Sequence, residues 1–485
     1  RPCLEGGNVV RLTYAPPPGS IATLPVPSLD AVRSVHLIGI GGAGMRNLAR
    51  LFIARGVSVT GSDLKDSDGL RELHSLGAIV SVGHAARQVG VPDAVVVSSA
   101  ISAANVELAH ARELELPVWA RAQALAAFAA GHRSIAIAGT HGKTTTTSML
   151  AVILERAGLD PSYLIGGDLN ESGSGARAGS GDLFVFETDE SDGSFLLSEP
   201  MLAIVTNIEV DHVDFYPGGQ EEIESAFAVF MQRAAAIIAC GDDAGVRRSS
   251  GLAGKPARTY GVGSHNDIRL EIQSEGPDGA EGIVRLEDGS TVTVRLRVPG
   301  VHNLLDATAA LLAAVAVGVD PSVATRALAG FTGVHRRFEL RGSARGASFF
   351  DDYGHNPTEM AVAVRTARGR APERLIAVVQ PHRYSRVQAL WKELGASVTD
   401  ADLILVTDVY GADQPPIPGV TGQLVADGAH IAAPDKEILY LPHRDDLLDY
   451  LEREVRSGDL VLTMGCGDVW MLGDAALVRI AEHDA

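Results

Sequence analysis

The stretch Gly139-Thr140-His141-Gly142-Lys143-Thr144-Thr145 decides the fold of this chain. A β-branched run at residues 134–138 precedes it and predicts a buried strand. The apolar spacing of residues 144–158 predicts a helix that ends at a glycine. A strand, a glycine loop and a helix start make a cradle for phosphate, because backbone N–H groups and the helix dipole both favour an anion. We therefore expect a nucleoside triphosphate site.

Two side chains of this loop fit that chemistry. Lys143 supplies a mobile positive charge, and the hydroxyl of Thr144 can hold Mg²⁺. The strict P-loop pattern has a glycine where this chain has Ile137, so the match is to a shorter G-x-x-G-K-T loop. The alternative is an ordinary glycine turn with a solvated lysine.

Polar residues follow the next two predicted strands, at residues 183–186 and 203–206. Ligands of open α/β sheets bind at the carboxyl ends of strands, so both clusters should face the Gly139 loop. Glu187 and His212 are then candidate Mg²⁺ ligands, although imidazole is a less usual ligand for this ion. We expect Asp189, Glu190 and Asp214 to be solvated loop residues or helix caps.

Length and composition set broader limits. The chain has 485 residues, a net charge of −19 and three cysteines far apart in sequence, Cys3, Cys240 and Cys466. We expect several α/β domains in a cytoplasmic protein that binds neither nucleic acid nor membrane. Residues 1–30 are proline-rich, have no initiator methionine and no signal peptide pattern, and are expected to form a loose leader.

A second glycine loop lies nearer the start of the chain. Gly39, Gly41 and Gly44 fit G-x-G-x-x-G after a predicted strand, and Asp63 ends the following strand. Taken alone, this pattern indicates a nicotinamide-dependent dehydrogenase. The same turn also holds any nucleotide diphosphate, so we expect a Rossmann-like module.

The second half of the chain continues the α/β pattern. Residues 259–298 predict antiparallel hairpins, and Asn303 opens an alanine-rich helix to residue 317, where it could be only an N-cap. Residues 330–335 predict a linker. Strands are then expected at residues 347–350, 375–379, 403–407 and 460–463, with polar clusters at 351–357 and 380–386.

This set of motifs, in this order, resembles the Mur ligase family of ATP-dependent enzymes of peptidoglycan precursor synthesis, and it resembles most the branch that adds alanine. The resemblance covers residues 33–470, with one departure, His355-Asn356-Pro357 where comparable members often have His-His-Pro. The matching segments are residues 39–45, 139–145, 189–192, 207–212, 302–303, 335–339, 351–355 and 380–384.

The resemblance implies three α/β domains: a Rossmann-like UDP-sugar domain (31–128), a central ATP-binding domain with a mostly parallel sheet (129–333) and a Rossmann-like amino-acid domain (334–485). It implies that ATP and Mg²⁺ activate the lactyl carboxylate of UDP-N-acetylmuramic acid as an acyl phosphate, which L-alanine then attacks. We expect a monomer or a weak homodimer.

The resemblance also implies a role for each site residue. Asn303 would bind adenine, Asp351 the ribose and Arg337 a phosphate, while Lys143 acts in catalysis. His355 with Arg383 or Arg386 would lie on the alanine side. His212 would take the place of the family's modified lysine as a metal ligand beside Thr144 and Glu187. The remaining residues are the nucleotide loop Gly139, Thr140, His141, Gly142, Thr144 and Thr145, and the UDP-sugar contacts Gly41, Gly42, Gly44, Met45 and Asp63.

Three alternatives remain open at this point. A dehydrogenase would leave the Gly139 loop without a role. A non-catalytic nucleotide switch would release no phosphate in response to an amino acid. A sibling ligase would add a preformed peptide or another amino acid in place of alanine.

Overall fold

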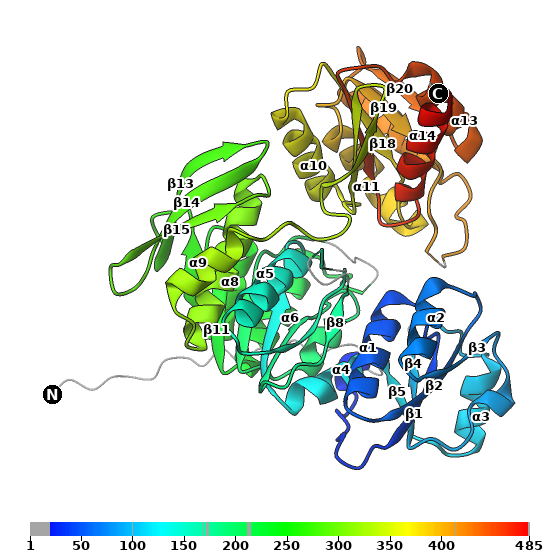
Figure 1. Cartoon of the computed structure of the whole chain (residues 1–485), viewed down its shortest axis with the longest axis vertical. Coiled ribbons are helices and arrows are strands. Elements are labelled where there is room, and N and C mark those ends of the chain that lie inside the picture. The colour runs from blue at the N-terminus through cyan, green and yellow to red at the C-terminus, as the bar shows by residue number, and fades with distance from the viewer. Residues whose placement is uncertain are drawn as a thin grey trace. The chain divides into compact units, whose positions relative to one another are not determined.

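The computed structural model describes residues 20–98, 100–167, 169–170, 174–210, 215–412 and 414–483 (Figure 1). The chain divides into two compact units. The first unit runs to Thr332 and holds two sheets, and the second begins at Gly333 and holds one sheet. The short segments 276–279 and 298–300 group with the second unit. Within the described residues, no helix combines the length and the apolar character needed to cross a bilayer.

The first sheet is a parallel, five-stranded sheet with the order β3-β2-β1-β4-β5. Consecutive residues of β1 face opposite layers, because Leu37 packs in the core cluster of α1 and Ile38 packs in that of α3. The expected Rossmann-like arrangement is thus confirmed. Its elements are β1 (Ser34–Ile38), α1 (Ala43–Ala54), β2 (Ser58–Asp63), α2 (Asp68–Ser75), β3 (Ile79–Val82), η2 (Ala86–Gln88), β4 (Ala94–Val97), α3 (Val106–Glu113), β5 (Val118–Ala120) and α4 (Arg121–Ala130).

The segment before this sheet is better ordered than the sequence predicts. Residues 20–30 contain a short 3₁₀ helix, η1 (Ile21–Thr23), and Ala22 and Leu29 are buried in the core. The side chain of Gln123 donates a hydrogen bond to the Pro25 carbonyl at 2.8 Å. The expectation of a loose leader is therefore wrong for residues 20–30, and residues 1–19 lie outside the described part of the chain.

The central sheet has ten strands in the order β15-β14-β13-β12-β11-β10-β6-β9-β7-β8. Its middle strands are buried along nearly their whole length, as expected for a parallel sheet that helices cover on both faces. The elements are β6 (Arg133–Ala138), α5 (Lys143–Arg156), β7 (Ser162–Leu164), β8 (Ala176–Arg177), β9 (Leu183–Glu187), η3 (Ser194–Leu197), β10 (Leu202–Val205), α6 (Gln220–Arg233), β11 (Ala236–Cys240), α7 (Ala244–Ala253), β12 (Arg258–Gly261), β13 (Ile268–Gly276), β14 (Gly279–Arg285), β15 (Thr291–Leu296), α8 (Val301–Ala316) and α9 (Pro321–Leu328).

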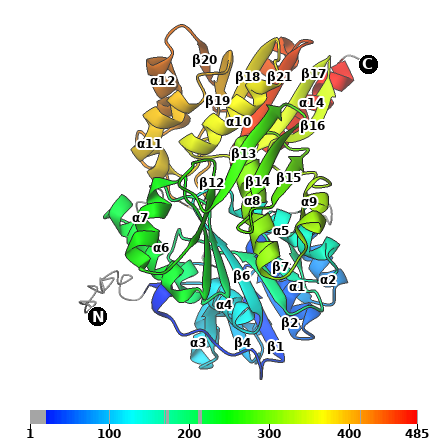
Figure 2. The same ribbon diagram turned by 90° about the vertical axis from the view of Figure 1, so that its left-hand side faces the viewer.

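Two local predictions for this region need correction. The expected hairpins are correct for β14 and β15, which pair antiparallel, but β12 and β13 pair in parallel (Figure 2). These strands extend the central sheet instead of forming a separate insertion. Helix α8 begins at Val301, so Asn303 lies in its first turn and is not the N-cap.

The second unit contains a six-stranded sheet with the order β16-β17-β21-β18-β19-β20, in which only β16 runs antiparallel to its neighbour. Separate apolar clusters cover its two faces. The four expected strands are present, whereas the edge strands β16 and β20 were not predicted. The elements are β16 (Glu339–Ala344), β17 (Ala347–Asp352), α10 (Pro357–Gly369), β18 (Arg374–Val379), α11 (Tyr384–Ser397), β19 (Leu403–Val406), α12 (Gly422–Ala432), β20 (Glu437–Tyr440), α13 (Arg444–Glu454), β21 (Asp459–Met464) and α14 (Trp470–His483).

Candidate functional site

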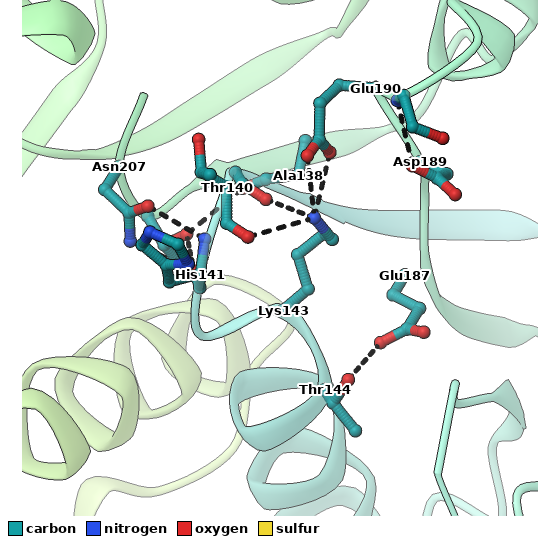
Figure 3. Close-up of polar contacts among 12 residues, drawn as sticks. Ala138, Thr140, His141, Lys143, Thr144, Glu187, Asp189, Glu190 and Asn207 are labelled. Carbon is teal, nitrogen blue, oxygen red and sulfur yellow. Dashed lines mark hydrogen bonds and ion pairs between the residues drawn. The ribbon is translucent and has the colours of Figure 1, made fainter. Parts of the chain in front are cut away.

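The loop at residues 139–142 leaves the carboxyl end of β6, the strand between β9 and β10. All three strands run parallel, so the segments after β9 and β10 reach the same edge of the sheet. Figure 3 shows Glu187 at the end of β9, Glu190 just after it and Asn207 after β10, gathered around this loop. The sequence predicted this grouping.

Two glycines allow the loop to lie close to its neighbours. Gly139 and Gly142 have positive φ angles of 140° and 81°, which side chains of L-residues rarely adopt. A Cβ atom on Gly139 would collide with the Thr206 hydroxyl, and one on Gly142 would lie 2.5 Å from Oδ1 of Asp306. The loop is thus packed tightly against β10 and α8, with Lys143 at the start of α5.

Lys143 forms the central ion pair of the site. Its Nζ lies 2.9 and 3.0 Å from the two carboxylate oxygens of Glu190 and donates to the Gly139 carbonyl (Figure 3). Burial disfavours the charged ammonium, but the carboxylates of Glu190, Asp189 and Glu187 outweigh burial and raise the pKa of Lys143. The expectation that Glu190 is solvated is wrong, because its side chain is 1% exposed and balances this buried cation.

Thr144 and Glu187 place hard oxygen atoms beside the loop. The Thr144 hydroxyl donates to Oε2 of Glu187 at 2.8 Å. A hydroxyl and a carboxylate next to a phosphate loop are a donor set that fits Mg²⁺. The third expected ligand, His212, and the loop residue Asp214 lie outside the described residues. Asp189 accepts the Ser191 N–H at 2.9 Å, a turn contact of the kind that the sequence predicted.

Residues after β10 brace the other side of the loop. The side chain of Asn207 accepts the His141 N–H at 2.8 Å and donates to the His141 carbonyl at 3.0 Å. His141 Nε2 lies 3.2 Å from the carboxylate of Glu209, whose own N–H donates to the Thr140 hydroxyl at 2.9 Å. These contacts hold the loop backbone in one conformation without using Lys143 or Thr144.

The first-domain glycine loop has different surroundings. The N–H groups of Gly39 and Ile40 donate to the Ser62 carbonyl, and that of Gly41 donates to the Asp63 carboxylate at 2.9 Å. A Cβ on Gly44 would lie 3.2 Å from Nη1 of Arg121, so a guanidinium lies against the start of α1. Of the other residues expected here, Gly42 is the N-cap of α1, while Met45 is 2% exposed and packs in the core.

A buried carboxylate supports this loop through Ser62, near the end of β2. Glu107 on α3 is fully buried, accepts the Ala85 N–H at 3.0 Å and also accepts a hydrogen bond from Ser62. Burial alone would raise the pKa of Glu107, but hydrogen bonds from His36, Ser62 and the Ala85 N–H lower it below the ordinary value. Glu107 therefore stays ionised at neutral pH and fixes the end of β2.

In the second unit, two adjacent aspartates end β17. Asp351 is fully buried, accepts a hydrogen bond from Arg336 at 2.8 Å and another from Thr463 at 2.7 Å. Asp352 accepts the N–H groups of Phe338 and Gly354. Burial raises the pKa of Asp352 to about 6, against the opposing charge of Arg337, and raises that of Asp351 against Arg336. Asp351 thus holds Arg336 in this structure.

The residues expected on the alanine side lie at neighbouring strand ends of the same unit. His355 follows β17, and its ring lies 5.3 Å from that of His382, which follows β18. Arg386 is 7% exposed, and its Nη1 lies 3.0 Å from Nδ1 of His382, while Arg383 is exposed. Sequence reasoning left the two arginines equivalent; the structure separates them by burial.

The remaining nucleotide residues divide between the units. Asn303 lies on α8 in the first unit, and Arg337 belongs to the second unit, 3.8 Å from Glu359 and over the ring of Tyr353. Sequence reasoning missed three residues, Glu190, Asp306 and Arg121. A usable signal existed only for Glu190, which lies three residues after the end of β9, beside a loop lysine that needs a counter-ion.

The fold and these contacts define the class of protein. It is an α/β nucleotide-binding protein in which a P-loop-type central domain follows a Rossmann-like one. Family models match nearly all of the three-sheet chain: "Mur ligase family, catalytic domain" matches residues 34–133, "Mur ligase middle domain" matches 137–314 and "Mur ligase, glutamate ligase domain" matches 336–467. The chain belongs to the Mur ligase family.

Individual relatives agree with this assignment. The chain is 44% identical over 460 residues to the UDP-N-acetylmuramate–L-alanine ligase of Paenarthrobacter aurescens, covering 93% of this chain and 98% of that one. It resembles the crystal structure of UDP-N-acetylmuramate-alanine ligase from Thermotoga maritima, with a TM-score of 0.78, 26% identity and coverage of 93% and 99%. It also resembles a murein peptide ligase from Psychrobacter arcticus, with a TM-score of 0.70, 26% identity and coverage of 92% and 98%.

Proposed function

We propose that this chain is an ATP-dependent ligase that joins L-alanine to the lactyl carboxylate of UDP-N-acetylmuramic acid, releasing ADP and phosphate. The observation that carries the proposal is full-length similarity to relatives of that name, at 43–46% identity, together with the Lys143 loop. The dehydrogenase alternative does not account for the family models that match all three domains. As an enzyme of precursor synthesis, the chain would act in the cytoplasm.

The central loop supplies the phosphoryl-transfer chemistry. Phosphoryl transfer asks the protein mainly for positioning and charge stabilisation. The loop amides and Lys143 would bind the β- and γ-phosphates, with the phosphate taking the place that Glu190 now holds on the ammonium. Thr144, Glu187 and His212 would hold Mg²⁺, which supplies charge neutralisation between the carboxylate and the γ-phosphate.

The other expected site residues would bind the remaining parts of the substrates. Gly41, Gly42 and Gly44 would bind the UDP diphosphate, and Arg121 would add positive charge beside them. Asn303, Arg337 and Asp351 would contact the adenosine and phosphate, and for Asp351 this requires the Arg336 pair to open. Arg386 or Arg383 would bind the alanine carboxylate, because a guanidinium fork matches both oxygens, and His355 would lie beside the amine.

The test is a product assay. The purified chain is incubated with ATP, Mg²⁺ and UDP-N-acetylmuramic acid, and the amino component is varied among L-alanine, D-alanine, glycine, L-serine and the tripeptide that begins with L-alanine. Product mass and phosphate release are measured together. Alanine-dependent product with equal phosphate release is expected. Preference for the tripeptide would assign the chain to the sibling activity. Phosphate release that does not respond to the amino component, with no joined product, would indicate a nucleotide switch.

A further inference from the structure

Three side chains of the second unit bring metal-ligating atoms together outside the nucleotide loop. One ligand atom each from His355, His382 and Cys466 lie within 4.8 Å of one another. The residues follow β17, β18 and β21, and β21 pairs in parallel with both of the other strands. The three carboxyl ends therefore meet at one edge of the sheet, which places residues from distant parts of the chain in one cluster.

The donor set points to one class of cation. Two imidazoles and one thiol are ligands that Zn²⁺ takes in sites with an open fourth position. Mg²⁺ prefers oxygen ligands, and a thiol selects against it. This cluster therefore differs in chemistry from the Thr144 and Glu187 oxygens of the central domain.

His355 is oriented as metal-binding histidines are. Its Nδ1 lies 3.1 Å from the Tyr353 carbonyl and 3.5 Å from the Glu359 carboxylate. Both neighbours accept hydrogen bonds, so Nδ1 carries a proton, and in the neutral ring Nε2 then carries the lone pair. A carbonyl or carboxylate behind the second ring nitrogen is the usual support of a histidine that binds a metal through the first.

His382 connects the cluster to Arg386. A guanidinium can only donate, so Nδ1 of His382 accepts the hydrogen bond from Arg386 at 3.0 Å, and Nε2 of the neutral ring carries the proton. A metal ion bound to Nε2 replaces that proton, so the ring hydrogen must lie on Nδ1. There it faces the N–H groups of Arg386, and two donors cannot form a hydrogen bond with each other. Metal binding and the Arg386 contact therefore exclude each other.

Cys466 supplies a thiol that burial keeps protonated. Burial raises the pKa of Cys466 to about 12, with Arg386 opposing the shift. A metal ion that binds this thiol displaces its proton. Cys240 in the central domain has a thiol pKa raised to about 12 for the same reason, but no comparable ligand cluster includes it among the described residues.

We propose that His355, His382 and Cys466 form a site for a thiophilic divalent cation of the Zn²⁺ class, and that an ion bound there releases Arg386 from His382 and inhibits the use of the amino-acid substrate. The second half of this statement rests on the proposed function, in which Arg386 and His355 lie on the alanine side. The first half rests on the cluster alone.

Metal binding is tested directly with Co²⁺ as the probe and without Mg²⁺ or nucleotide. Co²⁺ bound to a thiolate gives a charge-transfer band in the near ultraviolet. Cys466→Ala and the more conservative Cys466→Ser should lose the band and bind Co²⁺ about 10–100-fold more weakly. The matched control Cys240→Ala should retain the band, and Zn²⁺ should abolish it in the unchanged chain. A band that survives in the folded Cys466 variants, or disappears in Cys240→Ala, overturns the site.

Protection from alkylation gives a second readout that needs no variant. Zn²⁺ should slow the modification of Cys466 by a thiol reagent at least 10-fold, with no effect on Cys240, as followed by mass spectrometry of peptides. The proposal is contradicted if Zn²⁺ changes the modification rates of both thiols equally or changes neither.

An activity assay with added Zn²⁺ separates this inference from the proposed function. Zn²⁺ added to the Mg²⁺-supported reaction should raise the apparent KM for L-alanine and leave that for ATP unchanged. Cys466→Ala should keep basal activity within about twofold and resist the inhibition at least 10-fold. Equal inhibition of both proteins overturns the coupling to Arg386. A Cys466-dependent Co²⁺ band in a chain that ligates no amino acid would instead leave the site standing and overturn the proposed function.

Discussion

The two glycine loops of the first unit use the same backbone arrangement for different chemistry. Each follows a parallel strand and opens a helix, β1 to α1 in one case and β6 to α5 in the other. The central loop carries Lys143 against the buried Glu190, with Thr144 beside Glu187. The first loop has no lysine, one N–H bound to Asp63, and Arg121 alongside it.

The difference shows that the turn alone does not identify the ligand. Both loops offer backbone N–H groups and a helix dipole to an anion, which serves for binding. The central loop carries its cation, Lys143, within the loop itself and places the Thr144 hydroxyl beside Glu187, where a phosphate would be transferred. The side chains around a loop, more than its glycine pattern, distinguish a binding site from a reacting one.

Removal of the cation should have the largest effect. Lys143→Ala is expected to lower kcat on the order of 10²–10³-fold, because it removes a charge that stabilises the transferring phosphate. Circular dichroism should show an intact fold, and the exposed Lys392→Ala serves as the control with near-normal turnover. Near-normal turnover in a folded Lys143→Ala protein would mean that the two loops do not differ as described.

Removal of the counter-ion should come next. Glu190→Gln leaves a buried ammonium without its carboxylate, so we expect a loss of about 3 kcal/mol in the free energy of unfolding without nucleotide. Added ATP should then raise the Tm of this variant more than that of the unchanged chain, because its phosphates replace the missing charge. Glu199→Gln, at an exposed position, is the control. An equal response to ATP in both proteins would show that Glu190 is not exchanged for phosphate.

A change in the first loop should affect a different substrate. Gly44→Leu places a side chain against the Arg121 guanidinium, and we expect the KM for the UDP-sugar to rise about 10-fold, equivalent to 1.4 kcal/mol, with little change for ATP. Gly251→Leu is the control, since no neighbour lies within 4 Å of its Cβ position. A larger change in the KM for ATP would reverse the assignment of the two loops.

The smallest effect concerns the acid sensitivity of the first loop. Because the folded-state pKa of Glu107 lies below its ordinary value of 4.5, its contribution to stability is present above pH 4.5 and is lost as the pH falls below it. Thermal unfolding at pH 7 and pH 4 should therefore show a smaller pH-dependent loss of Tm in Glu107→Gln than in the unchanged chain. Glu113→Gln, an exposed change on the same helix, should behave as the unchanged chain. An equal loss of Tm between pH 7 and pH 4 in both variants would contradict this role for Glu107.

The correct sequence predictions are mostly of two kinds. Some concern local structure, and others concern residues that meet because the carboxyl ends of parallel strands share one edge of a sheet. The strand at 134–138, the loop and the helix were predicted within a residue or two, because their pattern lies in consecutive residues. The position of Glu187 beside Thr144 followed from the shared edge of parallel strands. Edge strands β16 and β20 were missed because they are short and largely half-exposed or exposed, without a continuous apolar run.

Features that depend on tertiary packing were not predictable. The burial of Glu190 belongs to the turn after β9, in which Gly193 has a φ of 74° and donates its N–H to the Glu190 carbonyl at 3.0 Å. The parallel pairing of β12 with β13 rests on only two residue pairs, which the sequence pattern of residues 259–298 does not reveal. Met45 lies in a glycine motif but faces the core, since the helical period turns it away from the loop.

If the Gly139 loop binds a triphosphate as we propose, the ion pair between Lys143 and Glu190 has a consequence for the reaction cycle. A resident carboxylate competes with an incoming triphosphate, so it weakens nucleotide affinity below what the loop alone would give. The same carboxylate can replace the departing phosphate stepwise, and product release then never has to expose a bare buried cation. With the proposed function, the protein would exchange one anion for another at this position, which would favour rapid turnover over tight retention of ADP.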